Sequence, residues 1–333
     1  MSPTFSSPPP PPLATSDWVG EAVRLAGPET LVRRDEPLAR HTTLRVGGPA
    51  DLFIEPAAEE ELGRLIAFCH GRGIAFFILG RGSNLLVRDG GFRGVVIRLS
   101  HPYFSRVELS GLRIVCGAGA RLKAVAVEAR RHALAGFEFL EGIPGSVGGA
   151  LRMNAGAMGG ATFDCVESVR VMDYDGVVAD WPAARMEVGY RECGALRNRI
   201  ALGARLAGSA GSRAAIGEKM ASFSQKRWGS QPAAPSAGCA FKNPAQIPAG
   251  RLIEELGMKG ARCGGASVSL EHGNFIVNDG TATARDVLDL IELIRGRARE
   301  ARGIALELEV QIIGDPASRA VTPTPFEAGD PHE

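Results

Sequence analysis

The sequence predicts a mixed fold of helices and strands in two or three domains, and three observations support this prediction. A helical pattern lies between two apolar strands at residues 52–79, which is typical of a β-α-β unit. Two apolar, Gly-rich stretches lie at residues 79–94 and 142–160. A run of small residues, AGSAGS at 207–212, indicates a domain boundary. The chain has 333 residues, 45% of them hydrophobic, which is enough for several cored domains.

The first part of the chain is predicted to contain strand, turn, strand and helix. The pattern at residues 41–56 indicates two strands joined by a turn. A helix is predicted after Pro56, because acidic residues complement the dipole of its first turn and apolar residues then recur at helical spacing. These residues are Glu59, Glu60, Glu61, Leu62, Leu65, Ile66 and Cys69. Gly71 and Gly73 end the helix, and Ala75–Leu79 is predicted to be the next strand.

The middle of the chain is predicted to be mainly strands. An apolar strand is expected at 94–99, short strands at 103–119, a helix at 122–132, and further strands at 166–173, 176–179 and 200–206. Tyr190 and Arg191 lie in a turn between two of them. Beyond the boundary we expect a helix at 216–228, a loop entering a strand at 231–244, and a short helix at 252–256 that Gly257 ends.

Two patterns describe the end of the chain. Thr283 with Asp286 three residues later resembles a capping box, which predicts a longer helix. The last element, ALELEVQIIG at 305–314, alternates apolar and polar residues and is predicted to be a strand. Its polar face carries Glu307 and Glu309, and periodicity alone cannot choose between them or distinguish either from a solvated surface carboxylate.

The two Gly-rich stretches predict a ligand. The sequence GIPGSVGGALRMNAGAMGG at 142–160 has seven Gly among nineteen residues and alternates them with apolar side chains. Glycine lacks the Cβ that would keep a ligand away, and successive N–H groups in such turns bind anions. The alternative is a tightly packed corner without a ligand. Neither stretch has a Rossmann or Walker A pattern, so together they suggest one long ligand with a central pyrophosphate, such as a dinucleotide.

Composition argues against several classes of function. The net charge is +1 and no basic stripe is present, which argues against a nucleic-acid partner. No apolar run approaches the ~20 residues of a membrane span. The Cys and His residues are scattered, so no metal site is expected, and the thiols suit a reduced, cytoplasmic protein. Residues 1–16 are Pro- and Ser-rich without the pattern of a secretory signal, and predict a disordered tail.

Six motifs occur together in one order, and their combination resembles the UDP-N-acetylenolpyruvoylglucosamine reductase family. They are LGRGSNLLVRDGGFRGVVI, GIPGSVGGALRMNAGAMGG, GYR at 189–191, PSAGCAFKNP, AGRLIEELGMKG and LELEV. The resemblance extends from about residue 41 to residue 314. The interval from Arg191 to Cys239 is too short for the inserted segment with a tyrosine that some members carry, so the chain resembles the shorter type.

The resemblance implies an α+β fold. A two-part FAD-binding unit of the vanillyl-alcohol-oxidase-like (PCMH-type) flavoprotein class would precede a C-terminal α+β substrate-binding domain. With the composition of the two ends, this gives a disordered tail at 1–20, FAD-binding subdomains at 21–101 and 102–212, a substrate-binding domain at 213–316, and a flexible tail at 317–333.

The implied activity is the NADPH-dependent reduction of UDP-N-acetylglucosamine enolpyruvate to UDP-N-acetylmuramate, a cytoplasmic step of peptidoglycan precursor synthesis that serves cell-wall biogenesis, cell shape and cell division. Hydride would pass from flavin N5 to the enolpyruvyl C3 and a proton would be delivered to C2. The FAD is expected to be non-covalent, because neither flavin loop contains a His, and a monomer is expected. The alternatives are another FAD-dependent oxidoreductase of this fold and a non-catalytic nucleotide-sugar-binding relative.

The resemblance also implies roles for three catalytic residues. Arg191 would polarise the substrate carboxylate, since a guanidinium fork suits a planar carboxylate. Glu309 would share this work, either protonated, through a water, or by orienting Arg191. The proton donor in the family is usually a serine, and Cys239 occupies that position here. A thiol is a stronger acid than a hydroxyl and is mostly protonated at neutral pH, so we predict that Cys239 donates the proton; the alternative is that it only packs there and water protonates C2.

Further residues match motif positions that contact ligands in the family. Those expected to bind the cofactor are Gly80, Arg81, Gly82, Ser83, Asn84, Leu85, Gly145, Ser146, Gly148, Gly149, Asn154 and Gly156. Those expected to bind substrate are Tyr190, Arg227, Gln231, Asn243, Lys259 and His272. Met158 and Cys193 depart from the family pattern and could alter the pocket. The cysteine at 239 is also expected to leave the site open to thiol oxidation.

Overall fold

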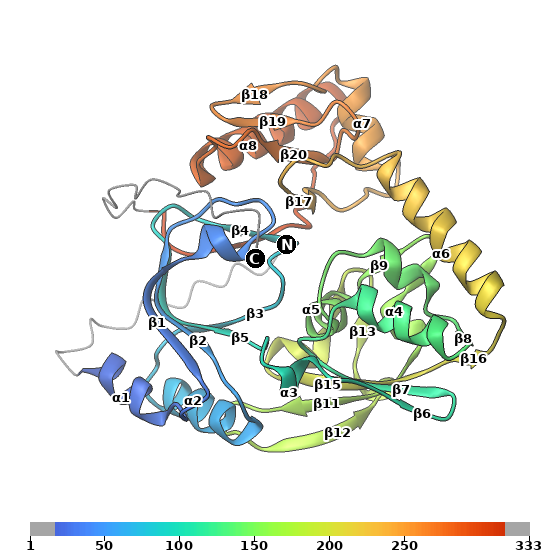
Figure 1. The fold of residues 1–333 in the computed structure, drawn as a ribbon. Helices are drawn as coiled ribbons and strands as arrows, with labels where there is room; N and C mark the ends of the chain where they lie inside the picture. The colour runs from blue at the N-terminus through green and yellow to red at the C-terminus, as the bar shows by residue number, and fades with distance from the viewer. Residues whose placement is uncertain (1–16, 317–333) are drawn as a thin grey trace, which may run out of the picture.

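A computed structural model describes residues 17–316 of the chain. Residues 1–16 and 317–333 of the predicted tails lie outside the described residues. The tail predicted at 1–20 extends too far, because Asp17 caps helix α1 (Trp18–Leu25), which already includes residues 18–20. Three parts follow one another along the chain, and α5 (Val147–Met153) lies near the middle of the view in Figure 1. Mixed helices and strands in this arrangement confirm the predicted α+β class.

The first part is a four-stranded sheet covered by two helices. Its strand order is β1 (Leu31–Pro37), β2 (Pro49–Glu55), β5 (Phe92–Arg98), β3 (Phe76–Leu79). The helices α1 and α2 (Glu59–Gly71) lie on one side of it (Figure 1). The predicted β-α-β unit is confirmed as β2, α2 and β3. Strands β2 and β3 both pair with β5 in parallel. Strand β1 and the 3₁₀ turn η1 (Leu38–His41) were not predicted.

The first turn of α2 also connects the first two parts. Glu59 is almost fully buried, and its carboxylate accepts hydrogen bonds from Arg170 of β11 (Val166–Met172) at 2.9 and 3.0 Å. Met172, Ile200 and Leu202 from the second part pack into the core beneath α2. The hydrophobic cores therefore extend across the predicted domain boundaries. The positions of those boundaries stay a prediction.

The second part is an antiparallel five-stranded sheet with helices on one face. Its strand order is β12 (Val178–Pro182), β11, β15 (Ile200–Ala207), β7 (Arg113–Gly117), β6 (Val107–Ser110). The helices are α3 (Pro102–Ser105), α4 (Leu122–Arg131) and α5, with 3₁₀ turns η2 (Glu138–Gly142), η3 (Thr162–Asp164), η4 (Ala183–Arg185) and η5 (Gly194–Arg197). Short pairs are β8 (Leu134–Ala135) with β16 (Ser209–Ala210), β9 (Gly156–Ala157) with β10 (Gly160–Ala161), and β13 (Val188–Gly189) with β14 (Glu192–Cys193).

The third part is a small sheet packed on two helices. Its strand order is β17 (Ser236–Cys239), β20 (Phe275–Asn278), β19 (Ala266–Val268), β18 (Arg262–Cys263). The helices are α7 (Ala249–Glu255) and α8 (Ala284–Arg302), and α6 (Arg213–Trp228) reaches this part from the second. The predicted capping box is confirmed, because the Thr283 hydroxyl accepts from Asp286 N at 3.1 Å and the Asp286 carboxylate accepts from Thr283 N at 2.9 Å.

The predicted last strand is only partly correct. Residues 311–313 form β21 (Gln311–Ile313), which pairs in parallel with β4 (Leu85–Val87) of the first part. The preceding residues make one isolated bridge, Leu308 to Phe241, and a backbone hydrogen bond from Glu309 N to Ala240 O of 2.9 Å. The segment crosses from the third part to the first, so its backbone partners change within a few residues and no long ladder forms.

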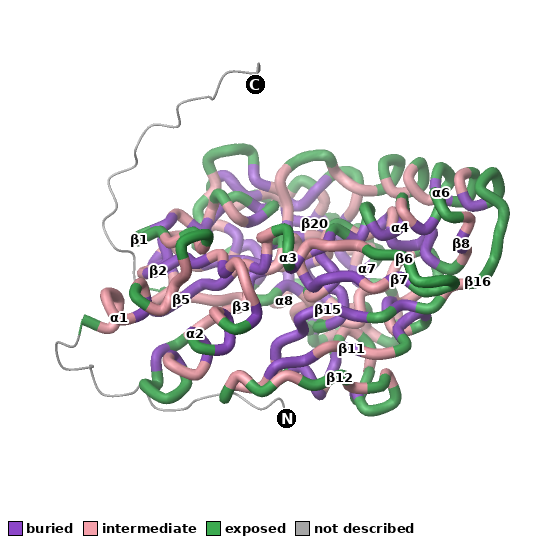
Figure 2. The backbone as a smooth tube through the Cα atoms, turned by 60° about the horizontal axis from the view of Figure 1, so that its bottom comes forward, coloured by how far each residue is buried: buried purple, intermediate pink, exposed green. Residues whose placement is uncertain are grey.

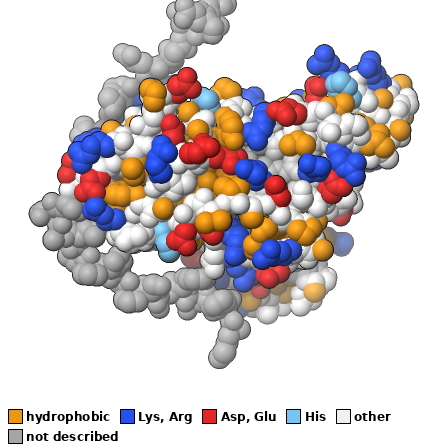
Figure 3. Space-filling view, turned by 90° about the horizontal axis from the view of Figure 1, so that it is seen from below, with side chains coloured by type: hydrophobic (Ala, Val, Ile, Leu, Met, Phe, Trp, Pro, Cys, Tyr) orange, Lys and Arg blue, Asp and Glu red, His pale blue; other side chains and the backbone are white. Residues whose placement is uncertain are grey.

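The face seen in Figure 3 carries charged side chains of both signs with hydrophobic side chains among them. Helix α6 is exposed over most of its length and buries Ile216 and Met220 against the second part, whereas β15 is largely buried (Figure 2). On the face seen in Figure 3, Lys and Arg side chains lie among Asp and Glu and not in one continuous patch. Within residues 17–316, none of the helices has the length and apolar character that a bilayer crossing requires.

Candidate active site

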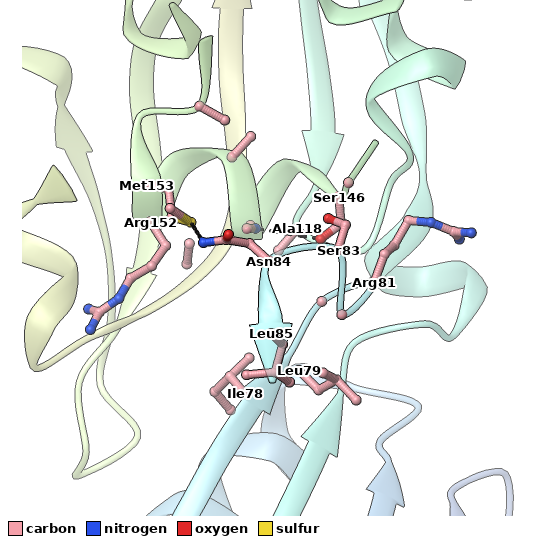
Figure 4. A pocket seen from close by; sticks show the side chains of 18 of the residues that line it. Ile78, Leu79, Arg81, Ser83, Asn84, Leu85, Ala118, Ser146, Arg152 and Met153 are labelled. Atoms are coloured by element: carbon pink, nitrogen blue, oxygen red, sulfur yellow. Dashed lines mark hydrogen bonds between the residues drawn. The ribbon is translucent and has the colours of Figure 1, made fainter. Parts of the chain in front are cut away.

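A cavity of about 790 Å³ lies where the three parts meet. Its wall comes mainly from residues 76–85 of the first part, residues 143–156 of the second, and residues 237–239 with Glu309 of the third. Ligand-binding cavities in proteins commonly measure about 300–1,000 Å³, so this one is large enough for an extended ligand. The two Gly-rich stretches, far apart in sequence, therefore face the same space (Figure 4).

The first glycine loop, residues 80–84, is braced from behind. Gly82 has φ of +61° and lies so close to His41 that a Cβ on it would be 2.3 Å from the His41 carbonyl oxygen. Thr43 N donates a hydrogen bond to Gly82 O at 3.2 Å. The Ser83 hydroxyl donates to Pro144 O at 2.6 Å and so joins this loop to the second one. The loop is thus held between two backbone segments.

The second glycine stretch contains a helix that the sequence analysis did not predict. Ser146 caps α5 by accepting from Gly149 N at 3.5 Å, and Asn154 ends it with a left-handed φ of 41°. Gly148 packs against Ala118, since a Cβ there would be 3.0 Å from the Ala118 Cβ. A Cβ on Gly145 or Gly149 would meet nothing closer than 3.6 Å. These two glycines therefore present bare backbone to the cavity.

We expect Gly82→Ala to destabilise the protein more than Gly111→Ala. Both glycines have a positive φ, +61° at Gly82 and +60° at Gly111, so alanine pays about 1–2 kcal/mol at either position. Gly111 has nothing within 4 Å of the added Cβ, whereas Gly82 faces the His41 carbonyl. Urea unfolding of both variants measures the difference. Equal losses would show that the 80–84 loop shifts freely away from His41.

The cavity is rich in arginine and carries one carboxylate. The arginines in its wall are Arg81, Arg98, Arg121, Arg152, Arg191, Arg197 and Arg199, and among the described residues the only acid in the wall is Glu309. Within residues 17–316, Arg81, Arg121, Arg152 and Arg199 form no ion pair, and burial lowers the pKa of Arg81 and Arg152. Arg81 and Arg152 extend to opposite sides of the loop (Figure 4). Unpaired cations beside bare glycine backbone fit an anionic ligand such as the pyrophosphate of FAD.

Five of these arginines were missed from the sequence. Arg152 carried a usable signal, because it is the only charged residue in the 142–160 stretch. Arg98 ends strand β5, and Arg121 directly precedes α4. Arg197 ends η5, and Arg199 directly precedes β15. No pattern in the local sequence distinguishes these four from ordinary surface arginines, because only the packing of the two sheets brings them to the same cavity.

Three elements bring the predicted catalytic residues to the cavity wall. Arg191 lies in the tight turn between β13 and β14, Cys239 ends β17, and Glu309 directly precedes the crossing to β21. Arg191 Nε is 2.9 Å from Glu309 Oε1, although without the alignment of a good hydrogen bond, and Arg191 Nη1 donates to Gly156 O at 3.4 Å. The side chain of Glu309 is 13% exposed, so the pair is largely withdrawn from water.

The same packing separates Glu309 from Glu307. The Glu307 side chain is 73% exposed and pairs with Lys242 at 3.5 Å outside the cavity. Burial raises the pKa of Glu309, and the nearby Arg191 opposes that rise. Burial, together with the Glu309 charge, raises the pKa of the Cys239 thiol to about 11, while Arg191 and a hydrogen bond with Asn274 oppose the rise. The thiol therefore holds its proton firmly at neutral pH, which argues against the expected ease of oxidation, since the thiolate is the form that reacts with oxidants.

The other predicted residues are placed less uniformly. All the predicted cofactor residues line the cavity except Asn154, whose amide donates to Gly189 O. The predicted substrate residues do not line it. Tyr190 is 58% exposed beside Arg191, and Arg227 bonds to Gln231 at 3.3 Å. Within the third part, Asn243 Oδ1 accepts from Ala249 N, Lys259 pairs with Glu254, and His272 packs on Phe275.

Two family models match the chain. Residues 50–181 match the model described as "FAD binding domain", and residues 231–313 match "UDP-N-acetylenolpyruvoylglucosamine reductase, C-terminal domain". Together with the arginine-rich cavity, these matches define an FAD-dependent oxidoreductase with an added C-terminal domain.

Full-length relatives agree with both models. The UDP-N-acetylenolpyruvoylglucosamine reductase of Clostridioides difficile is 42% identical over 85% of this chain and 94% of its own length, and that of Heliobacterium modesticaldum is 45% identical over 85% and 90%. The crystal structure of the enzyme of this name from Thermus caldophilus has a TM-score of 0.74 and 41% identity, covering 85% of this chain and 98% of that one. The chain belongs to the UDP-N-acetylenolpyruvoylglucosamine reductase family.

Proposed function

We propose that this protein reduces UDP-N-acetylglucosamine enolpyruvate to UDP-N-acetylmuramate, with NADPH as the hydride source and FAD as the carrier. The observation that carries the proposal is the meeting of Arg191, Glu309 and Cys239 on one cavity wall, beside two glycine loops. A guanidinium, a carboxyl group and a protonated thiol supply charge and a proton, which reduction of an enolpyruvyl ether requires.

The glycine loops and the unpaired arginines would hold the FAD. Gly145 and Gly149 present bare backbone, and Arg81 and Arg121 supply positive charge on the side of the first loop. When bound, FAD supplies the hydride that is added at the enolpyruvyl C3. The residues that then matter for the second half of the reaction are those that bind the carboxylate and protonate C2.

Arg191 would bind the substrate carboxylate. Its Nε faces Glu309 and its Nη1 donates to Gly156 O, whereas Nη2 has no hydrogen-bond acceptor in the part of the chain that the structure describes. A permanently charged donor on the cavity wall can stabilise negative charge that develops on the carboxylate as hydride is added. The side chain is fixed before substrate arrives, so little reorganisation is needed.

Glu309 would orient Arg191 as its ion-pair partner, and we expect Glu309→Gln to slow product formation by about 10²-fold, as loss of a preorganised charge commonly does. Glutamine is neutral and can donate a hydrogen bond, as a protonated carboxyl can, so a native rate would favour a protonated Glu309 instead. Glu307→Gln is the matched control, and its exposed side chain predicts no change. Single-turnover mixing of the reduced enzyme with substrate measures both variants.

Cys239 would deliver the proton to C2. Its thiol is kept protonated by burial and by the Glu309 charge, and the Asn274 side chain hydrogen-bonds to it. A thiol that stays protonated at neutral pH can act as a general acid when negative charge developing on the substrate accepts its proton.

The raised pKa of Cys239 predicts slow alkylation. With a pKa of about 11, only about one thiol in a thousand is ionised at pH 8, against about a quarter for an ordinary thiol. Iodoacetamide should therefore label Cys239 at least about 100-fold more slowly than free cysteine at pH 8, and the rate should rise until about pH 11. Peptide mass spectrometry follows the labelling; a rate that levels off by pH 9 would contradict the assigned environment.

The predicted substrate residues are proposed to bind the UDP-sugar from outside the cavity. Arg227 lies in the last turn of α6, and Gln231 follows the end of that helix. Burial lowers the pKa of Arg227. Burial is the main cause that lowers the pKa of His272, and the nearby charge of Lys259 lowers it further. Both groups supply donors suited to a diphosphate and a sugar.

The experiment that tests the function is a pair of stopped-flow half-reactions on the native holoenzyme. NADPH should bleach the flavin absorbance, and UDP-N-acetylglucosamine enolpyruvate should restore it with formation of UDP-N-acetylmuramate. Reduced flavin that ignores this substrate but reacts with another acceptor would instead support a different oxidoreductase of this fold. A purified chain that takes up no FAD would support a non-catalytic nucleotide-sugar-binding relative.

A further inference from the structure

We propose that Asn154 and Asn84 are positioning residues, which fasten Arg191 and Glu309 to the two glycine loops so that cofactor binding and carboxylate binding are coupled. The inference rests on the proposed function of Arg191 and Glu309. Both asparagines belong to the glycine stretches, yet their amide groups bond to the backbone of the segments that carry the proposed catalytic pair.

Asn154 holds the turn that presents Arg191. It ends α5, and its Nδ2 donates to Gly189 O at 3.2 Å while its Oδ1 accepts from Phe163 N at 3.1 Å. Gly189 and Glu192 are paired across the β13–β14 hairpin, so only Tyr190 and Arg191 lie in the turn. The amide therefore acts on the residue at the foot of the turn, two positions before Arg191.

The turn needs such an attachment because its backbone is strained. Arg191 has φ of 59°, a left-handed conformation that glycine or asparagine adopts more readily than arginine. Backbone strain of this kind persists only where surrounding contacts enforce it, and it gathers at functional sites. Within residues 17–316, the side chain of Arg191 is held by Gly156 O and Glu309, and Asn154 supplies the matching hold on the backbone.

Asn84 holds the segment that carries Glu309. Its Nδ2 donates to Glu309 O at 2.9 Å and lies 2.8 Å from Met153 Sδ, the contact drawn in Figure 4. The main-chain carbonyl oxygen of Asn84 accepts a hydrogen bond from Gln311 N at 3.0 Å. One residue of the first glycine loop thus contacts the last residue before Asn154 and both sides of the chain around Glu309.

These contacts form a continuous connection from the cofactor loops to the ion pair. Displacing either loop by a fraction of an ångström would move Gly189 O or Glu309 O and change the separation of Arg191 and Glu309. Any ligand that orders the 80–84 and 143–156 loops would then also fix the pair. The substrate half of the reaction should depend on both amides, whereas reduction of FAD by NADPH should not.

The decisive variant is Asn154→Asp in the FAD-loaded full chain. Aspartate tolerates the left-handed φ and keeps the acceptor for Phe163 N, but it loses the donor to Gly189 O. We expect the FAD dissociation constant and the rate of reduction by NADPH to stay within about 2-fold. Product formation in a single turnover should fall about 10-fold or more, and the substrate concentration that perturbs the oxidised flavin spectrum should rise, because a strained turn is released.

A matched control removes the same kind of bond elsewhere. Asn278 Nδ2 donates to Leu44 O at 3.0 Å and its Oδ1 accepts from Gly280 N, away from the ion pair. Asn278→Asp should lower the unfolding midpoint without changing either half-reaction. Asn84→Ser, which replaces the second amide with a hydroxyl, should also slow product formation in a single turnover about 10-fold or more, and it serves as the second variant if the first does not fold.

Each outcome decides the proposal. A variant with native substrate kinetics and native spectral titration would overturn it. A large rise in the FAD dissociation constant with an unchanged substrate step would also overturn it, and would make Asn154 the cofactor ligand that the sequence implied. If the native protein is reduced by NADPH but never reoxidised by the enolpyruvyl substrate, the proposed function itself fails and the inference fails with it.

Discussion

Cys239→Ala is expected to slow product formation about 10²- to 10⁴-fold, the usual contribution of a general acid, while reduction of FAD by NADPH stays normal. The thiol lies on the cavity wall beside Glu309 and Arg191, and burial keeps it protonated with a pKa of about 11. Alanine removes the proton and little volume. Stopped-flow reduction by NADPH, followed by mixing with the enolpyruvyl substrate, separates the two steps.

Two further cysteine variants test the explanation. Cys239→Ser restores a protic side chain and should recover much of the rate, whereas Cys263→Ala changes a half-buried thiol on β18 and should behave as native. Product formation at the native rate in Cys239→Ala would show that water protonates C2 and that the cysteine only packs against its neighbours.

Arg191→Asn is expected to slow product formation about 10²- to 10³-fold, as removal of a preorganised charge at a developing anion does. Asparagine tolerates the φ of 59° at this position, so the change removes the guanidinium without adding backbone strain. It also leaves the largely buried side chain of Glu309 without its partner, which should raise the pKa of that carboxyl further. The same two half-reactions measure the effect, with the loss confined to the substrate step.

Unfolding free energies distinguish the effect of losing the Arg191 charge from the effect of backbone strain at this position. Arg191→Asn should unfold with a free energy about 1 kcal/mol higher than Arg191→Ala, because alanine adopts a positive φ less readily. Arg185→Asn is the control for loss of an arginine, since Arg185 stacks on Trp181 at 3.5 Å and does not line the cavity. A native substrate step in Arg191→Asn would remove Arg191 from the proposed mechanism.

Elements with strong local signals were predicted well. The acidic first turn and apolar face of α2, the capping box of α8, and the turn holding Tyr190 and Arg191 are confirmed. Each depends on residues within a few positions of one another, so local sequence contains most of the information. Strand β1 and helix α5 were not predicted: β1 has a mixed, largely exposed pattern, and the four glycines around the start of α5 disguise a helix of one or two turns.

The candidate site was predicted as a set of residues and not as a geometry. The motif resemblance named Arg191, Cys239 and Glu309, and the structure brings all three to one cavity wall. Most of the arginines in that wall were missed, because each is ordinary in its local sequence. Asn154 was named as a cofactor residue, but its amide contacts Gly189 O, a partner 35 residues away that no local pattern indicates.

By itself, the sequence determined the class of the fold, the two backbone stretches suited to a long anionic ligand, and the family. Those properties depend on local composition and on motif order, which survive without coordinates. Only the tertiary structure decided which carboxylate serves the site: Glu307 and Glu309 share one face of the same pattern, yet one is exposed beside Lys242 and the other is buried against Arg191. The chain crosses between two parts of the molecule at that point, and burial and charge there are set by segments more than a hundred residues away.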